Sequence, residues 1–145
     1  MIQLYTLGYT HKSAERLFSL LNKNDIENLI DIRLNNTSQL AGFTKKNDFE
    51  FFLRKISAIN YYHFQYLSPT KDILNAYKKK EINWNEYEKI FNILMKERKI
   101  ETRINLSLLH KGCLMCSEEC ADKCHRRLVA EYFKNIFNEI VIIHI

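Results

Sequence analysis

The sequence predicts an α/β fold, a single domain built on a mostly parallel five-stranded sheet flanked by helices, of Rossmann-like character. Short runs rich in β-branched and aromatic residues alternate with longer segments whose apolar residues recur at helical spacing. The length of 145 residues suits one domain with one substantial core, so residues 1–145 are expected to fold together. Polar residues follow several of the expected strands, as in α/β proteins whose sites lie at the strand ends.

The first elements follow from their apolar patterns. Residues 2–9 are rich in β-branched and aromatic side chains, which favours a strand. Ser13 can cap a helix whose apolar face runs from Leu17 to Leu21. Residues 26–34 are nearly continuous in Ile and Leu, which is typical of a strand buried on both faces.

The next segment contains a long polar loop, predicted over residues 35–46. Asn47 and Glu50 have the spacing of a capping box, which predicts a helix that begins there and ends near Ile59. The aromatic run 61–67 predicts the third strand.

Two further helices are expected before the fourth strand. The first follows Pro69 and ends at the lysine triplet Lys78–Lys80. Asn83 and Glu86 form a second capping-box pattern ahead of an apolar helical face. Residues 104–109 then predict the fourth strand.

The last elements complete the alternation. A helix is predicted over residues 125–137 and a strand over residues 140–145. Alternating strands and helices predict a parallel sheet, in which sites form where strands end at their carboxyl termini. Polar segments 8–11, 31–33 and 113–125 occupy such positions, so we expect them to converge on one cleft.

Charge and composition limit the partners. The net charge of +5 favours an anionic ligand such as a nucleotide or a nucleic acid, although solvated lysine-rich helices explain it equally well. No signal peptide is visible, and the apolar runs are too short to span a bilayer. We therefore expect a cytoplasmic protein without a membrane partner, with reduced cysteines.

All four cysteines lie between residues 113 and 125. The predicted catalytic residues are Cys116, Glu118, Cys124 and His125. The amino-terminal end of the helix at His125 would lower the pKa of Cys124 and favour its thiolate as a nucleophile. Glu118 or His125 would move a proton, and Arg126 would bind an anionic group. The alternative is structural, with cysteines filling gaps and Glu118 paired with Arg126.

The same segment suggests a metal site. Cys113 and Cys116 form a half-site for zinc or an iron–sulfur cluster, which Cys120 and Cys124 could complete. If the segment were helical, the four cysteines would lie on one face. Packing alone can produce such a stripe, so zinc stays one of two alternatives.

Residues after the first two strands are predicted to bind substrate. Gly8 and Thr10 lie in a turn whose amides can face a phosphate. Asp31 and Arg33 lie at a strand end, where they would position substrate or form an ion pair that locks the strand. Both alternatives stay open for this pair.

Five short motifs together resemble the DUF488 family. They read Gly8-Tyr9-Thr10, Asp31-Ile32-Arg33, Cys116-Ser117-Glu118, Cys124-His125-Arg126 and His144-Ile145. Their order and separations are similar to the family pattern over essentially the whole chain. Tyr9 replaces a histidine that is common in the family, and Cys113 and Cys120 are additions to it. The resemblance implies a compact α/β fold, but it implies no particular reaction.

Three functional hypotheses follow. The first is a small intracellular enzyme that acts on a nucleotide, a nucleoside or a nucleic-acid base. The second is a non-catalytic nucleic-acid-binding module whose cysteine cluster holds a structural zinc ion. The third is a regulatory domain that senses redox state through Cys116 and Cys124.

Overall fold

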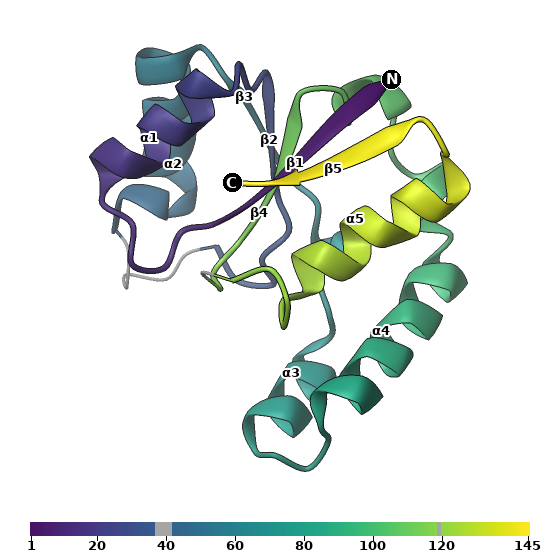
Figure 1. Ribbon diagram of the computed structural model, residues 1–145. Coiled ribbons are helices and arrows are strands. Elements are labelled where there is room, and N and C mark those ends of the chain that lie inside the picture. Colours follow the sequence, from purple (N-terminus) through teal and green to yellow (C-terminus); the bar gives the residue numbers. More distant parts are fainter. Residues whose placement is uncertain (37–41, 119) are drawn as a thin grey trace.

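A computed structural model describes residues 1–36, 42–118 and 120–145. Its five strands form one all-parallel sheet in the order β3-β2-β4-β1-β5, which confirms the predicted fold class (Figure 1). The strands are β1 (Ile2–Gly8), β2 (Asn28–Asp31), β3 (Asn60–His63), β4 (Gly112–Cys116) and β5 (Ile140–His144). β4, which comes late in the chain, therefore lies between β1 and β2 at the centre of the sheet.

Helices cover both faces of the sheet. They are α1 (Ala14–Lys23), α2 (Lys46–Phe52), α3 (Lys71–Lys78), α4 (Trp84–Arg98) and α5 (His125–Ile136). Helices α1 and α2 pack on one face, while α5 packs on the other with α4 against it (Figure 1). In the described part of the chain, no helix has the length and apolarity needed to cross a bilayer.

Two of the three predicted helix caps are confirmed. The Ser13 side chain accepts a hydrogen bond from the Arg16 amide at the start of α1. Asn83 and Glu86 form a reciprocal capping box at the start of α4. The capping box predicted for Asn47 is wrong, because α2 begins earlier, with Lys45 at the N-cap and no side-chain cap.

The third strand and its preceding helix differ from prediction mainly in their ends. Helix α2 continues as a π-helical segment, η2 (Leu53–Ser57), close to the predicted end of the helix. β3 begins at Asn60 and is shorter than predicted, because the chain turns into the 3₁₀ helix η3 (Gln65–Leu67). Residues 37–41 of the predicted polar loop lie outside the described part of the chain.

The fourth strand was predicted in the wrong place. Residues 104–109 contain a 3₁₀ turn, η5 (Leu106–Leu108), which Asn105 stabilises by accepting a hydrogen bond from the Ser107 amide. The strand is instead Gly112–Cys116, which is buried on both faces. Because that run contains no β-branched residue, its strand propensity is weak and burial determines its conformation. The cysteine segment therefore begins inside the sheet.

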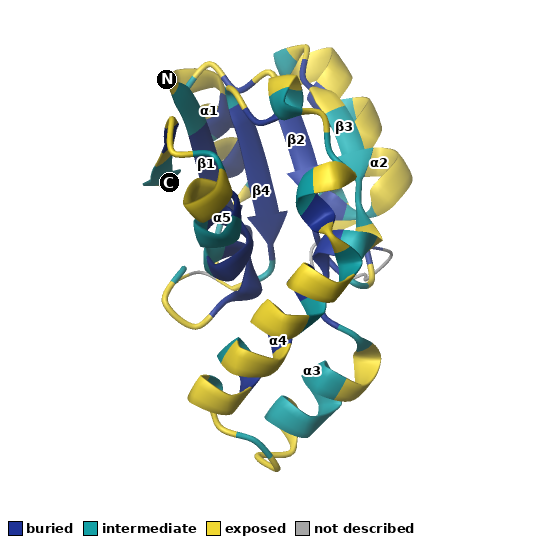
Figure 2. Ribbon diagram, turned by 90° about the vertical axis from the view of Figure 1, so that its right-hand side faces the viewer, coloured by how far each residue is buried: buried dark blue, intermediate teal, exposed yellow. Residues whose placement is uncertain are grey.

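The strand ends face a helical hairpin formed by α3 and α4. The arrows of β2 and β4 point toward this hairpin, which extends beyond the carboxyl edge of the sheet (Figure 2). The α3–α4 hairpin follows β3 in the chain, and its return leads back to the central strand β4. The fold thus places a helical wall opposite the edge at which parallel sheets form sites.

Candidate functional site

A cavity of about 660 Å³ lies between the carboxyl ends of the central strands and the α3–α4 hairpin. Several of the residues predicted to form a site line it, namely Arg33, Cys116, Glu118, Cys124 and His125. These residues come from the turn after β2, from the end of β4 and the loop after it, and from the start of α5. Topology therefore brings together side chains that are far apart in the sequence.

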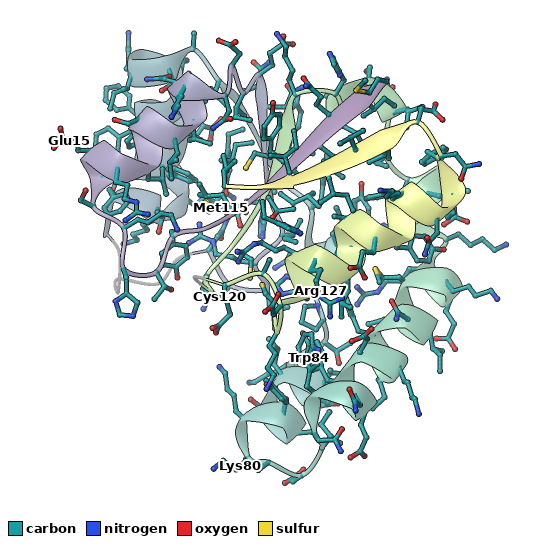
Figure 3. The ribbon with its side chains drawn as sticks, in the orientation of Figure 1. Glu15, Lys80, Trp84, Met115, Cys120 and Arg127 are labelled. Atoms are coloured by element: carbon teal, nitrogen blue, oxygen red, sulfur yellow. The ribbon has the colours of Figure 1, made fainter. Side chains whose placement is uncertain are left out.

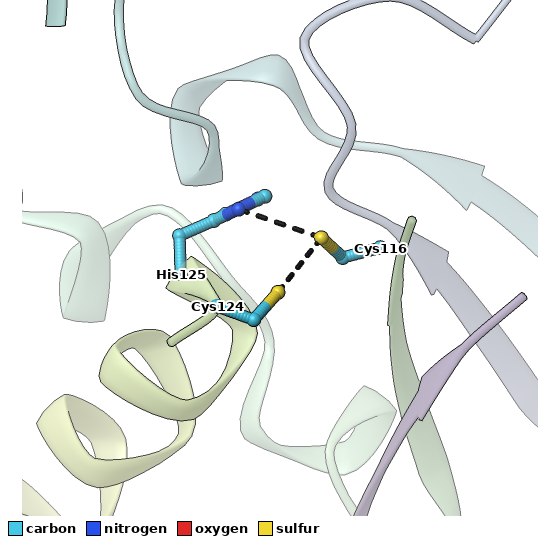
Figure 4. Close-up of side chains that lie close together, drawn as sticks. All are labelled: Cys116, Cys124 and His125. Carbon is cyan, nitrogen blue, oxygen red and sulfur yellow. Dashed lines mark hydrogen bonds between the residues drawn. The ribbon is translucent and has the colours of Figure 1, made fainter. Parts of the chain in front are cut away.

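The centre of the site is a group of two thiols and an imidazole. Cys116 ends β4, while Cys124 and His125 are the N-cap and the first residue of α5. Cys116 Sγ lies 2.9 Å from Cys124 Sγ and 3.5 Å from His125 Nδ1 (Figure 4). All three side chains are buried and both cysteines are free thiols. The group is therefore a compact, buried cluster that lines the cavity.

A backbone carbonyl fixes the orientation of His125. Its Nε2 lies 2.8 Å from the carbonyl oxygen of Ile32. A carbonyl oxygen only accepts, so Nε2 carries the proton and donates it. The ring of Phe91 packs edge-on against the imidazole, with centroids 5.9 Å apart. Nδ1 is thereby directed toward Cys116, where it can accept the thiol proton.

Several groups favour the thiolate of Cys116. Burial alone raises the pKa of this thiol, and the hydrogen bond from Cys124 is the largest effect that lowers it. The backbone amides of Glu118 and Ser117 donate to the same sulfur, and the positive charge of Arg126 acts in the same direction. The net effect lowers the pKa of Cys116 below its ordinary value. A thiolate is the nucleophilic form of cysteine.

Cys124 behaves in the opposite way, so the predicted lowering of its pKa by the helix terminus is wrong. The hydrogen bond to Cys116 is the largest cause that raises the pKa of Cys124, followed by burial and by the negative charge of Cys116. The neighbouring His125 lowers it by less. Opposite shifts are expected of two coupled thiols, because the first proton lost belongs to the pair. Of the two, Cys116 is therefore the better acceptor and Cys124 the better proton donor.

The predicted four-cysteine metal site is also wrong. Cys113 packs in the cluster beneath α1 and α2, while Cys116 faces α5, because neighbouring odd and even positions of a strand point to opposite faces. Burial raises the pKa of Cys113 to about 12. Cys120 is exposed on the loop between β4 and α5 (Figure 3). The four thiols therefore cannot converge on one ion.

A smaller metal site has ligands in place. The ligand atoms of Cys116, Cys124 and His125 lie within 4.8 Å of one another. Tetrahedral zinc with Zn–S bonds of about 2.3 Å separates two sulfurs by roughly 3.8 Å. The observed separation of 2.9 Å is shorter, so zinc would have to move the thiols apart. The three side chains form a Cys-Cys-His ligand set. Their spacing in this structure suits two hydrogen-bonded thiols better than it suits a bound zinc ion.

Asp31 and Arg33 form the ion pair that was one of two predicted alternatives. Arg33 Nη2 and Nε donate to the two carboxylate oxygens of Asp31 at 2.8 and 2.9 Å. Arg33 also donates to the hydroxyl and carbonyl oxygens of Thr44, at 3.2 and 2.6 Å. Both charged residues are buried. These donors of Arg33 are directed at other groups of the protein. The geometry therefore favours the ion pair over the predicted role of Arg33 in binding a substrate anion.

Hydrogen bonds hold the backbone on both sides of the Ile32 carbonyl. The Ile32 amide donates to the Met115 carbonyl at 3.1 Å, which continues the pairing of β2 with β4. His63 Nε2 lies 2.8 Å from the Arg33 carbonyl oxygen and donates to it. Held at these points, the turn after β2 presents the Ile32 carbonyl to His125. Asp31 and Arg33 flank this carbonyl in the chain, and their side chains bind each other.

The turn after β1 supports the reactive loop, which corrects the predicted binding role of Gly8 and Thr10. The Thr10 amide donates to the Ser117 carbonyl at 3.0 Å, and the Thr10 hydroxyl donates to the same oxygen. The Tyr9 amide donates to the Cys116 carbonyl. A Cβ on Gly8 would lie 1.5 Å from the carbonyl oxygen of Glu118. These amides therefore bind the loop after β4, and phosphate would have to bind elsewhere.

Arg126 is buried behind this loop. Its guanidinium donates to the backbone carbonyl of Glu118 and, at 3.4 Å, to the hydroxyl of Thr6. Its side chain is 1% exposed, and it is absent from the residues that line the cavity. Glu118 is exposed and does line the cavity. Arg126 thus holds the loop and adds positive charge near Cys116, which replaces its predicted role as a substrate clamp.

Comparison with known families agrees with the motif pattern. Residues 13–133 match the family described as "Domain of unknown function DUF488". The chain belongs to the DUF488 family. The match contains Asp31, Arg33 and the whole segment from Cys113 to Arg126, whereas the Gly8 turn and His144 lie outside it. No curated protein and no solved structure matches the chain.

In this DUF488 protein, sequence reasoning missed one wall of the cavity. The missed residues come mainly from the α3–α4 hairpin and combine aromatic rings with lysines: Lys71, Tyr77, Lys78, Trp84, Tyr87 and Lys123. The Trp84 and Tyr87 rings are stacked, with centroids 4.8 Å apart. Trp84 lies at the start of α4 (Figure 3). A single tryptophan in the chain was the one available signal, but nothing in the sequence places it opposite β4.

Replacing Gly8 with alanine should destabilise the fold and disturb the site. The new methyl group would overlap the Glu118 carbonyl, and such overpacking costs about 1–3 kcal/mol or more. Gly42→Ala is the matched control, because a Cβ there meets nothing within 4 Å. Urea denaturation should show a large decrease in the free energy of unfolding for Gly8→Ala. For Gly42→Ala, this free energy should change by no more than about 0.5 kcal/mol. Equal stability of the two variants would contradict the close approach of β1 to the loop.

Proposed function

We propose that this DUF488 protein is a small enzyme that acts on a nucleotide, a nucleoside or a nucleic-acid base and uses Cys116 as its nucleophile. The observation that carries the proposal is the placement of His125, with Nε2 bound to Ile32 and Nδ1 3.5 Å from Cys116 Sγ. A nucleophile, a base within reach of it and a third group that orients the base form the usual arrangement for covalent catalysis.

The chemistry of the cavity supports this class of substrate. Lys71, Lys78 and Lys123 can bind phosphate oxygens, and Trp84 and Tyr77 offer faces and edges to a flat ring. Glu118 can accept hydrogen bonds from sugar hydroxyls or from amino groups of a base. A volume of about 660 Å³ falls within the range typical of small-molecule sites.

The reaction would run in two displacements. Cys116 attacks an electrophilic carbon of the substrate, so that an S–C bond forms as the bond from that carbon to its leaving group breaks. His125 holds the proton released by Cys116 and gives it to the leaving group. Water, deprotonated by His125, then displaces the sulfur and restores the thiolate. Cys124 keeps its proton and stabilises the Cys116 anion by hydrogen bonding.

Trp84 makes binding in the cavity measurable. Since it is the single tryptophan, nucleoside phosphates and short oligonucleotides should quench its fluorescence in a saturable way. Lys78→Gln should weaken binding by about tenfold, equivalent to roughly 1.4 kcal/mol. Lys79→Gln is the control, because the neighbouring lysine does not line the cavity.

Turnover of whichever ligand binds should depend on the thiol and its base. Cys116→Ser should abolish it, and His125→Gln should lower it by about 10² to 10⁴ while the quenching remains. Unchanged turnover in both variants, or no response of Trp84 to any of these ligands, would refute the proposal.

A second candidate is the nucleic-acid-binding module with structural zinc, and the Cys-Cys-His ligand set favours it. Protein purified without chelator would then hold about one zinc ion per chain and would unfold when the metal is removed. Cys116→Ser would lose the metal, whereas Cys120→Ser would retain it. Metal-free protein that stays folded would exclude this candidate.

A further inference from the structure

The two sulfurs of the site are closer than sulfurs in ordinary packing contact. Cys116 Sγ and Cys124 Sγ lie 2.9 Å apart, and a disulfide bond of about 2.05 Å would require them to approach by only about 0.9 Å. Cys124 is the N-cap residue, with extended backbone (φ −136°, ψ 141°), so its side chain is attached outside the regular helix. Only the loop between β4 and α5 separates the two residues in the chain.

We propose that Cys116 and Cys124 form a modification site, at which a hydroperoxide oxidises Cys116 and Cys124 closes a reversible disulfide with it. Both residues line the cavity, so a small oxidant reaches them by the route that a substrate would use. Cys116 Sγ lies between the Cys124 thiol, 2.9 Å away, and His125 Nδ1, 3.5 Å away, so a base that can take its proton is beside it. Cys116 is therefore the sulfur that attacks the oxidant.

The chemistry balances in two steps. Cys116 attacks the outer oxygen of the hydroperoxide, an S–O bond forms and the O–O bond breaks, and the alkoxide or hydroxide leaves and takes up a proton. Cys124 sulfur then attacks the resulting sulfenic acid. An S–S bond forms, the S–O bond breaks, and hydroxide leaves with the proton of Cys124 as water. Two thiols are oxidised and one hydroperoxide is reduced to an alcohol or to water.

The other two thiols cannot take the place of Cys124. Cys113 lies on the opposite face of the sheet with its side chain fully buried. Cys120 is exposed, and its sulfur belongs to no cluster with Cys116 in the described part of the chain. Cys120 therefore serves as an internal reference. If exposure alone decided which thiol is oxidised, Cys120 would be oxidised first.

Disulfide formation would also remove the nucleophile. Once bonded to Cys124, the Cys116 sulfur can neither attack carbon nor exchange a proton with His125. This consequence rests on the proposed function, whereas the disulfide itself does not. A thiol reductant would restore both free thiols and, with them, turnover.

Peptide mapping of the full-length protein treated with hydrogen peroxide tests the site. The expected result is a bond between Cys116 and Cys124, reversed by a thiol reductant, with the Cys120 thiol still free. In Cys124→Ser, Cys116 should remain as a sulfenic acid that dimedone traps, and then oxidise irreversibly. In Cys116→Ser, dimedone labelling of the site should disappear, and Cys120→Ser should behave as the unmodified chain does.

Two results would contradict the proposed disulfide. A bond that joins Cys120 to either residue, or equal peroxide sensitivity of Cys116 with and without Cys124, would refute the modification site. Since the peptide map of the unaltered protein is sufficient, a variant that fails to fold does not remove the test. A disulfide that forms while turnover continues would refute the role of Cys116 as nucleophile and leave the modification site in place.

Discussion

The hydrogen bond from His125 Nε2 to the Ile32 carbonyl is the interaction on which the site depends. It joins the turn after β2 to the first residue of α5, two segments separated by most of the chain. Because the carbonyl can only accept, the bond assigns the imidazole proton to Nε2 and leaves Nδ1 for Cys116. Ile32 lies between the two members of the buried ion pair Asp31–Arg33, so this turn is held on both sides of the carbonyl.

A second constraint holds the loop that carries Cys116. The turn after β1 pairs with the backbone of this loop, Gly8 leaves room for the Glu118 carbonyl, and Arg126 bonds that carbonyl from behind. The amides of Ser117 and Glu118 are thereby directed at the Cys116 sulfur. The loop thus stabilises an anion on the protein's own sulfur, and the predicted phosphate-binding turn serves as its support.

The sequence predicts the fold, and which residues line the cavity, better than it predicts what each of these residues does. Alternation of strands and helices, with caps at Ser13 and Asn83, was sufficient for the all-parallel sheet. The fourth strand was misplaced because residues 104–109 are mostly apolar and begin with the β-branched Ile104, whereas β4 contains no β-branched residue. The direction of the pKa shift of Cys124 was mispredicted, because a helix-terminus argument considers that residue alone. Only the structure shows that Cys116 Sγ lies 2.9 Å from Cys124 Sγ, within reach of a hydrogen bond.

The wall formed by α3 and α4 could not be predicted because it depends on how a hairpin packs across the strand ends, which no local pattern encodes. Its lysines and Trp84 line the same cavity as the two thiols.

The central claim is that His125 faces Cys116 through Nδ1. Long-range ¹H–¹⁵N spectra of the histidine rings test it most directly. We predict a proton on Nε2 at every pH at which the protein is folded, and a shift of the Nδ1 resonance alone when Cys116 is replaced with serine. A neutral ring protonated on Nδ1, or an Nδ1 resonance unaffected by Cys116→Ser, would contradict the account.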